Sequence, residues 1–199
     1  MIPRHLMIGM AVMIAAAMGL GVYAWHIRSG VGARESLSTS SQPVAPPVSG
    51  PTEQVTLFVA YDDPGSLRAK AVRIPLPAGR QERALEVLRA LINIYLDKSS
   101  LHALPAGSEI RDVYLVEPGL AVIDLNPIFA DNHSSGVLVE ELTVASLVQT
   151  LATNVPGLTR VKILVDGKER DTLAGHLDLT DFFDVGAMGT LVAQLQRSP

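Results

Sequence analysis

The stretch LTRVKILVDGKERDTLAGHLDL, from Leu158 to Leu179, organises the fold that the sequence predicts. In its first half, β-branched residues occupy every second position, at Val161, Ile163 and Val165. A period of two indicates a strand with one buried face, which leaves Lys162 and Leu164 on the solvent-facing side. We therefore expect a strand that ends at Val165.

A turn is predicted directly after this strand, at Asp166-Gly167-Lys168. Asp-Gly between apolar runs is a strong turn signal, because glycine adopts a positive φ at no steric cost. Thr172 to Leu179 is then expected to return as a second extended segment, with Gly175 at a bulge or at a close approach of the backbone. The rest of the domain is expected to cover this hairpin.

Composition limits the classes of protein to which the chain can belong. Its 199 residues are 48% hydrophobic and 18% charged, which fits one domain of ordinary size with additional segments. The net charge of -4 argues against a nucleic-acid partner. Cysteine is absent, which excludes disulfides, thiolate metal sites, cysteine nucleophiles and a lipidated N-terminal cysteine.

A long apolar run near the N-terminus predicts a transmembrane helix. Leu6 to Trp25 contains no charged residue, and a helix of this length spans about 30 Å, the thickness of the bilayer hydrocarbon core. A cleaved signal peptide and a buried core helix are the alternatives. The run is longer than the roughly 7 to 15 apolar residues of a signal peptide, which favours a retained anchor over residues 1–28.

Between the anchor and the globular region lies a stretch dominated by Ser, Gly, Pro and Thr, residues 29–52. Such a composition has few large apolar side chains to offset the entropy of ordering, so we predict a flexible linker. The globular domain is predicted over residues 53–184. Residues 185–199 form a C-terminal tail, with a short helix expected around Leu191 to Gln196.

Within the domain, hydrophobic spacing alternates between strand and helix periods. Further strands are predicted at Val55–Ala60, Ala71–Leu76, Ile110–Val116 and Leu120–Leu125. Two helices are predicted, at Arg80–Lys98 and Val137–Asn154. The order β-β-α-β-β-α-β-β indicates an α+β fold in which two helices cover one face of a mainly antiparallel sheet.

Both helices are expected to be amphipathic. In the first, Glu82 in the first turn and Lys98 in the last suit the helix dipole. Ser134 or Ser135 is expected to cap the second helix. Its apolar face is predicted to hold Leu138, Leu142, Ala145, Val148, Leu151 and Ala152, and its solvent face Glu140, Thr143 and Thr150.

Three carboxylates, of Asp62, Asp63 and Asp124, are candidates for acid/base catalysis. Asp62 and Asp63 precede Pro64-Gly65, a pattern more typical of a turn than of paired catalytic acids. Asp124 near the end of a strand could be a catalytic base. It lacks a histidine or a second acid at a defined spacing, so a solvated or capping role is favoured.

A further constellation involves the histidines. His176 and Asp178 share one face if their segment is extended, and with His102 or His133 they could form a metal or hydrolase site. The favoured interpretation is structural, with a bulge at Gly175 and local hydrogen bonds from His176. Ser134-Ser135-Gly136 does not match a nucleophile elbow, and HExxH and glycine-rich phosphate loops are absent. We predict no enzyme activity and no catalytic, cofactor-binding or metal-binding residues.

Several motifs resemble one known family. They are Leu101–Ser108 (LHALPAGS), Leu120–Leu125 (LAVIDL), Leu147–Val161, Leu164–Lys168 (LVDGK) and Thr172–Leu179 (TLAGHLDL). Together they resemble the GerMN domain, the sporulation and spore germination module of bacterial envelope proteins, over about Val55 to Asp184. The resemblance implies a fold similar to ring-building motifs, the small domains that pack side by side in membrane-associated rings, and no catalytic activity.

These observations predict a membrane-anchored, non-enzymatic cell-envelope protein that serves in protein-protein assembly. Its partners are expected to be the membrane, through Leu6 to Trp25, and other envelope proteins or itself. The charges flanking the anchor nearly balance, so the family resemblance places the domain outside the cytoplasmic membrane of a single-pass protein. The alternative is a binding domain for a small envelope ligand such as a glycan or peptide. An assembly module should present a flat, partly apolar surface, and a ligand-binding domain a concave pocket with convergent polar groups.

Overall fold

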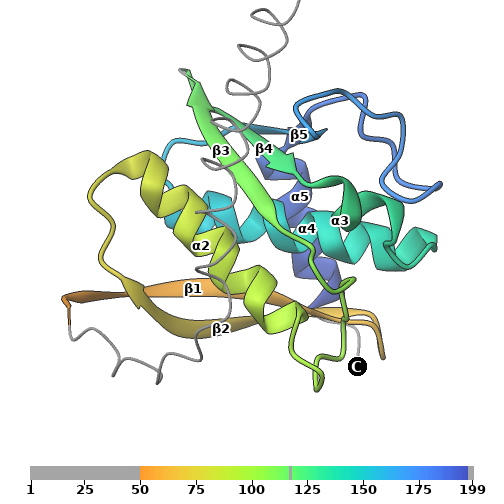
Figure 1. Cartoon of the computed structure of the whole chain (residues 1–199), viewed down its shortest axis with the longest axis horizontal. Helices are drawn as coiled ribbons and strands as arrows, with labels where there is room; N and C mark the ends of the chain where they lie inside the picture. The colour runs from red at the N-terminus through yellow and green to blue at the C-terminus, as the bar shows by residue number, and fades with distance from the viewer. Residues whose placement is uncertain (1–49, 117, 197–199) are drawn as a thin grey trace, which may run out of the picture. The chain divides into compact units, whose positions relative to one another are not determined.

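Six strands and four helices make up the part of the chain that the structure, a computed structural model, describes: residues 50–116 and 118–196 (Figure 1). The strands are β1 (Thr52–Tyr61), β2 (Ser66–Pro75), β3 (Ile110–Val116), β4 (Leu120–Leu125), β5 (Arg160–Val165) and β6 (Phe183–Asp184). The helices are α2 (Arg80–Tyr95), α3 (Pro127–Asp131), α4 (Val137–Asn154) and α5 (Val185–Leu195). None of these four helices has the length and apolarity needed to cross a bilayer. The predicted membrane segment, Leu6 to Trp25, lies outside the described residues.

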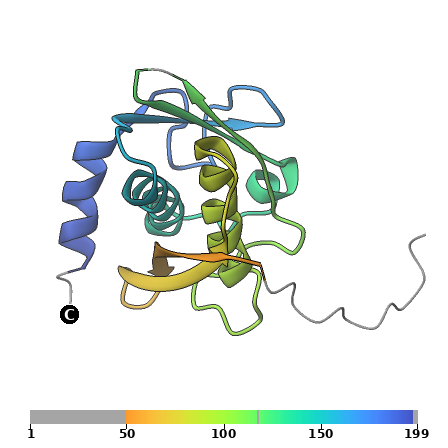
Figure 2. The same cartoon turned by 90° about the vertical axis from the view of Figure 1, so that its left-hand side faces the viewer.

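The predicted α+β class is confirmed, but the single sheet is not. The strands form two sheets, a β1-β2 hairpin and a four-stranded sheet in the order β3-β4-β5-β6. Figure 2 shows α2 and α4 between these sheets, with the hairpin below and the larger sheet above. The helices therefore have sheet on two sides, whereas helices that cover one face of a single sheet would have sheet on one.

The β1-β2 hairpin stays separate because helix side chains occupy the free edge of β1. Three backbone N–H groups donate there, Thr56 to Asn154 Oδ1 at 3.1 Å, Phe58 to Thr150 Oγ1 at 2.8 Å and Ala60 to Tyr95 Oη at 2.9 Å. Asn154 Nδ2 also donates to the carbonyl oxygen of Thr56 at 2.7 Å. An edge whose polar groups are satisfied in this way needs no further strand.

The four-stranded sheet is mixed. β3 and β4 are antiparallel, as predicted, but β4 and β5 are parallel and in register, with Ile123 opposite Ile163. Parallel neighbours require a long crossover connection, and α4 supplies it between the two strands. The other three strand pairs in the described residues are antiparallel, so the mainly antiparallel arrangement is confirmed, and β4-β5 is the exception.

The turn after β5 is confirmed, and the returning strand is not. Asp166 and Gly167 have φ values of 54° and 71°, and the N–H of Lys168 donates to the carbonyl oxygen of Val165 at 3.1 Å. Two positive φ values in succession define the primed turn that favours Asp-Gly. Thr172 to Leu179, however, forms a loop with one isolated bridge, between Thr172 and Asp178. The antiparallel partner of β5 is instead the two-residue β6.

The predicted solvent face of α4 is wrong. Glu140, Thr143 and Thr150 are buried, while Leu138 on the predicted apolar face is 43% exposed. The reason is that α4 contacts α2, β1 and α5 and so lacks a continuous solvent face. Its N-cap is Gly136, not Ser134 or Ser135, so the helix has no capping bond from an N-cap side chain.

Three smaller differences concern element ends. α2 ends at Tyr95, so Lys98 is outside the helix and the last turn carries no basic residue, whereas Glu82 lies in the first turn as predicted. Asn126-Pro127 follows β4 directly and starts a short helix that was not predicted, α3, in which the Asn126 side chain accepts from Phe129 N. The C-terminal helix begins at Val185, six residues before the predicted start, because the Asp184 side chain caps it.

Candidate functional site

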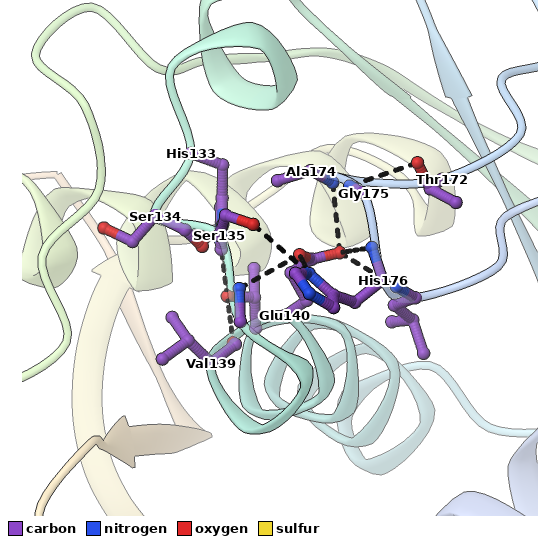
Figure 3. A network of polar contacts seen from close by, with 12 residues as sticks. His133, Ser134, Ser135, Val139, Glu140, Thr172, Ala174, Gly175 and His176 are labelled. Carbon is purple, nitrogen blue, oxygen red and sulfur yellow. Dashed lines mark hydrogen bonds and ion pairs between the residues drawn. The ribbon is translucent and has the colours of Figure 1, made fainter.

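The most connected polar group in the described part of the chain is the buried carboxylate of Glu140 on α4. Figure 3 shows it pointing at the backbone of Ala174 to His176. Oε2 accepts from the N–H groups of Ala174 (3.1 Å), His176 (3.1 Å) and Leu177 (2.9 Å). Oε1 accepts from Gly136 N at 3.2 Å and from His176 Nδ1 at 2.9 Å.

These donors determine the charge state of Glu140. Burial alone would raise the pKa of the carboxyl, but the N–H groups of Leu177 and Ala174 and the His176 ring together lower the pKa to about 2. The group is therefore an anion at neutral pH. The sequence predicts that Thr172–Leu179 pairs with a strand. Its N–H groups at Ala174, His176 and Leu177 instead donate to the Glu140 carboxylate. Gly175, with φ +113°, permits the curvature.

A second buried charge holds the other end of the same loop. Lys162 was expected on the solvent-facing side of β5 but is buried. Its Nζ donates to the carbonyl oxygens of Leu179 (3.2 Å) and Thr180 (2.5 Å) and lies 3.1 Å from Glu169 Oε1. The Phe182 ring covers it at 5.6 Å. The Glu140 carboxylate thus accepts hydrogen bonds from backbone N–H groups of this loop, and the Lys162 ammonium donates to backbone carbonyl groups at its other end.

The surface arrangement of His176 does not form a catalytic triad. Ser135 Oγ lies 3.2 Å from His176 Nδ1, the same nitrogen that donates to Glu140. A triad needs the carboxylate and the nucleophile on opposite ring nitrogens, so that the ring can accept the hydroxyl proton. His176 Nδ1, which donates to Glu140, therefore cannot act as the base that activates Ser135. The favoured structural interpretation of His176 agrees with this geometry.

In residues 50–116 and 118–196, the other two histidines form a separate cluster on Thr143, and His176 is not part of it. His102 Nε2 and His133 Nε2 each lie 2.8 Å from Thr143 Oγ1, and His102 Nδ1 lies 2.6 Å from Asp62 Oδ1. The turn that contains Asp62 therefore also anchors a buried imidazole, which no local sequence pattern predicts.

Hydrogen-bond geometry assigns the protons of this cluster. His133 Nδ1 must donate to the carbonyl oxygen of Ser134, at 2.7 Å. Burial lowers the pKa of His133, so its Nε2 is unprotonated at neutral pH and can only accept. The single Thr143 hydroxyl proton is also directed at the carbonyl oxygen of Val139, at 2.9 Å. The order carboxylate, imidazole, hydroxyl in Asp62, His102 and Thr143 superficially matches a triad. Thr143 is fully buried, however, so no substrate can reach its hydroxyl.

The two remaining candidates also have structural roles. Asp124 is buried, and its Oδ1 accepts from Gly167 N at 2.7 Å, which holds the turn after β5 against β4. Asp178 accepts from the N–H and hydroxyl groups of Thr180, at 2.7 and 2.6 Å. In residues 50–116 and 118–196, no three His, Asp or Glu side chains lie close enough together to hold a metal ion.

The outer side of the four-stranded sheet presents a different kind of surface. Val113, Ala121, Ile123 and Val161 point inward and are fully buried. Their neighbours point outward, and Figure 2 shows no helix of the domain above them. We call this surface the outer sheet face; it comprises Tyr114 (45% exposed), Val116 (46% exposed), Leu120, Val122 and Phe182 (50% exposed).

Pairing across the strands makes this face continuous. Tyr114 is opposite Val122, and Val116 is opposite Leu120, which in turn pairs with Arg160 on β5. The Arg160 guanidinium lies over the Phe182 ring, 5.2 Å from its centroid. The result is an exposed surface of aromatic and aliphatic side chains with a basic margin, on a sheet whose first strand, β3, has a neighbour on one side only.

Two clefts complete the candidate surfaces. One, of about 490 Å³, lies between the hairpin and the end of α2 and is lined by Tyr61, Lys70, Ile94 and Asp97 among others. The other, of about 650 Å³, lies beside the start of α2 and the end of α4. In the second cleft, Arg83 is already paired with Glu53 at 2.5 Å, and Arg80 donates to the carbonyl oxygen of Pro156 at 2.5 Å.

Fold and surfaces define an α+β domain whose charged and histidine side chains stabilise the structure and whose exposed sheet face is partly apolar. The family model for Germane, sporulation and spore germination, matches residues 56–171, more than half of the chain. The chain belongs to this family, as the resemblance to the GerMN domain predicts. No curated protein matches the chain.

Two solved structures are similar to this chain. The tandem GerMN domains of the sporulation protein GerM from Bacillus subtilis match with a TM-score of 0.51 and 18% identity, over 67% of this chain and 46% of that chain. This chain thus spans less than half of the tandem protein. The first GerMN domain of the same protein matches with a TM-score of 0.47 and 20% identity, over 66% of this chain and 97% of that chain.

Proposed function

We propose that this protein is a membrane-anchored, non-enzymatic component of the cell envelope whose Germane domain works by contacting other proteins. The outer sheet face carries the proposal, because it is exposed and partly apolar, as an assembly module requires. Aromatic residues and arginine, here Tyr114, Phe182 and Arg160, are enriched at the centres of protein interfaces. Contiguous exposed apolar surface on a soluble domain commonly marks an interaction site.

The anchor strengthens weak contacts between such domains. Residues 1–28 would hold each copy at the cytoplasmic membrane, and residues 29–52 would let the domain turn on the extracytoplasmic side. Confinement to two dimensions raises the effective concentration of neighbouring domains. An interface too weak to form a dimer in solution can therefore build an assembly at the membrane. The partner is a second copy of the chain or another envelope protein.

Photo-crosslinking in intact membranes tests the contact surface. A photoreactive phenylalanine analogue replaces Tyr114 on the outer sheet face in the full-length protein. The same analogue at Arg73, an exposed position on β2, is the matched control. We expect a discrete crosslinked product from position 114 only, and its mass distinguishes a second copy from another protein. Equal crosslinking from both positions, or none from position 114, would contradict the proposal.

Topology has a separate test. Alkaline phosphatase fused after Pro199 should be active if the domain is extracytoplasmic, and a fluorescent cytoplasmic reporter at the same point should be dark. Full-length protein should also remain with membranes after carbonate extraction. An inactive phosphatase together with a fluorescent reporter would reverse the topology. Release of the intact full-length chain from membranes by carbonate would contradict a membrane anchor in residues 1–28.

A further inference from the structure

The cleft between the β1-β2 hairpin and the end of α2 contains polar groups that the fold does not use. Lys70 pairs with Leu57 across the hairpin, so both side chains point to the same side of it, and Leu57 is fully buried beneath the helices. Lys70 therefore points toward α2, yet its ammonium group has no partner among the described residues. Asn93, near the end of α2, lines the same cleft, and its amide also lacks a partner in this part of the chain.

The carboxylate of Asp97 adds a negative charge to the lining of the same cleft. Asp97 follows α2 and stands four residues after Asn93. Its Oδ1 accepts from the N–H of Ser99 at 2.8 Å and from the Ser99 hydroxyl at 2.5 Å. These bonds lower the pKa of Asp97 and fix its carboxylate, whereas Oδ2 has no partner in the described part of the chain.

The floor and rim of the cleft are apolar. Tyr61 and Ile94 are half-buried, and Leu101 is 64% exposed although it belongs to an ordered loop. The carbonyl of Leu101 accepts from Asp62 N at 3.1 Å, which fixes the loop to the hairpin. A volume of about 490 Å³ falls within the range of about 300 to 1,000 Å³ typical of small-ligand sites.

We propose that this cleft binds a small zwitterion, a free amino acid or short peptide whose ammonium group contacts Asp97 and whose carboxylate contacts Lys70. Asn93 can bond either end, because its amide both donates and accepts. An apolar ligand side chain packs against Ile94 and Leu101. The site is independent of the outer sheet face, which belongs to the other sheet, so either proposal can fail alone.

The larger cleft beside the start of α2 fits such a ligand less well. Arg83 is paired with Glu53 there and Arg80 with a backbone carbonyl, so a ligand would have to displace existing bonds. In the smaller cleft, Lys70 and Asp97 form no ion pair with each other, so a ligand would not have to displace one.

NMR titration of the full-length ¹⁵N-labelled chain in detergent micelles tests the site. The probe is the dipeptide alanyl-leucine, compared with its N-acetylated form, its C-terminal amide and phosphoethanolamine. Exposed charge pairs bind weakly, so we expect a Kd of about 1 mM. Saturable shifts should be confined to residues that line the cleft. Each blocked dipeptide should bind at least about threefold more weakly.

Variants assign the two charges. Lys70→Gln and Asp97→Asn should each raise the Kd at least about threefold, and the amide oxygen introduced by Asp97→Asn can still accept from Ser99. Lys168→Gln and Asp181→Asn remove one exposed charge of each sign away from the cleft and should leave the Kd unchanged. Lack of saturable shifts, equal binding of a blocked dipeptide, or equal effects of the control variants would overturn the site. Binding of phosphoethanolamine without the dipeptide would overturn the peptide assignment.

Discussion

At Glu140, five hydrogen bonds converge on one carboxylate that is fully buried. Three come from the backbone of the Thr172–Leu179 loop, so the stability of that loop depends on a residue about 35 positions earlier. A buried charge is favourable only where such bonds replace its hydration. Removing the charge should therefore disorder the loop as well as destabilise the fold.

Glu140→Gln tests this dependence. The amide group of glutamine would place N–H donors against N–H donors, and we expect a loss of about 2 to 4 kcal/mol in the free energy of unfolding. Chemical denaturation measures it, and amide exchange of Ala174 and Leu177 should accelerate. Glu141→Gln, one position along and without a partner in the described part of the chain, is the matched control. Similar denaturation midpoints for the two variants would contradict the role of Glu140.

Acid should remove the contribution of the Glu140 carboxylate to the free energy of unfolding. The pKa of Glu140 is about 2 in the folded state and 4.5 ordinarily, so its contribution is complete above about pH 4.5 and declines as pH falls toward 2. The stability difference between wild type and Glu140→Gln should therefore shrink across this interval. His133, whose pKa burial lowers, destabilises the fold from about pH 6.5 downward, but it does so in both proteins. A difference that stays constant down to pH 2 would be incompatible with an ionised Glu140.

At the scale of elements, the turn after β5 was predictable because its signal is local. Asp166-Gly167 needs no partner to specify a primed turn, and the structure has both positive φ values. The following loop was not predictable, because Thr172–Leu179 has the spacing of a strand while its bonding partner is a glutamate on a distant helix. Glu140 looks like an ordinary first-turn acid in the sequence.

Gly167→Val isolates the backbone requirement of the turn. No atom lies within 4 Å of a Cβ built at Gly167, so the variant introduces strain without a clash. A β-branched residue at φ 71° should cost on the order of 1 to 3 kcal/mol. Gly50→Val, at an exposed position without a positive φ and with equally free space, should be close to neutral in the same thermal unfolding measurement. Equal losses for both variants would mean that the turn carries no special strain.

The prediction that Thr150 on α4 faces solvent is wrong for a related reason. Ser146, Thr150 and Asn154 recur at four-residue steps, which in isolation indicates a solvated helix face. In the fold, Thr150 and Asn154 bond β1, and Ser146 lies 2.5 Å from the Tyr95 hydroxyl that bonds Ala60. Small hydroxyl and amide side chains can serve either water or a strand edge, and periodicity does not distinguish the two.

Asn154→Ala should expose this difference. It leaves the N–H and carbonyl groups of Thr56 without their side-chain partner, at a cost of about 2 to 3 kcal/mol. An unprotected strand edge also promotes association, so the variant should aggregate at lower temperature in light-scattering measurements. Thr153→Ala, on the exposed side of the same helix turn, should change neither property. Unchanged stability in the Asn154 variant would show that the edge needs no protection.

At the scale of the whole molecule, the class and the family were predictable, and the layering was not. The order of strands and helices is compatible with one sheet covered by helices or with two sheets that enclose them. The bonds between α4 and β1 decide between these arrangements, and they join residues about 90 or more positions apart. The same layering leaves the outer sheet face uncovered, so the surface proposed for assembly follows from a feature that the sequence does not reveal.

The central claim is that the outer sheet face, and not the histidine and carboxylate groups, performs the function. The most direct measurement compares the membrane assembly of Val116→Asp with that of His176→Ala, by crosslinking full-length proteins and resolving the products by size. Val116 is exposed, so its variant should keep the unfolding midpoint of the wild type and lose the crosslinked species. His176→Ala should keep that species at temperatures where it remains folded. Loss of assembly in a folded His176→Ala protein, with Val116→Asp unaffected, would contradict the account.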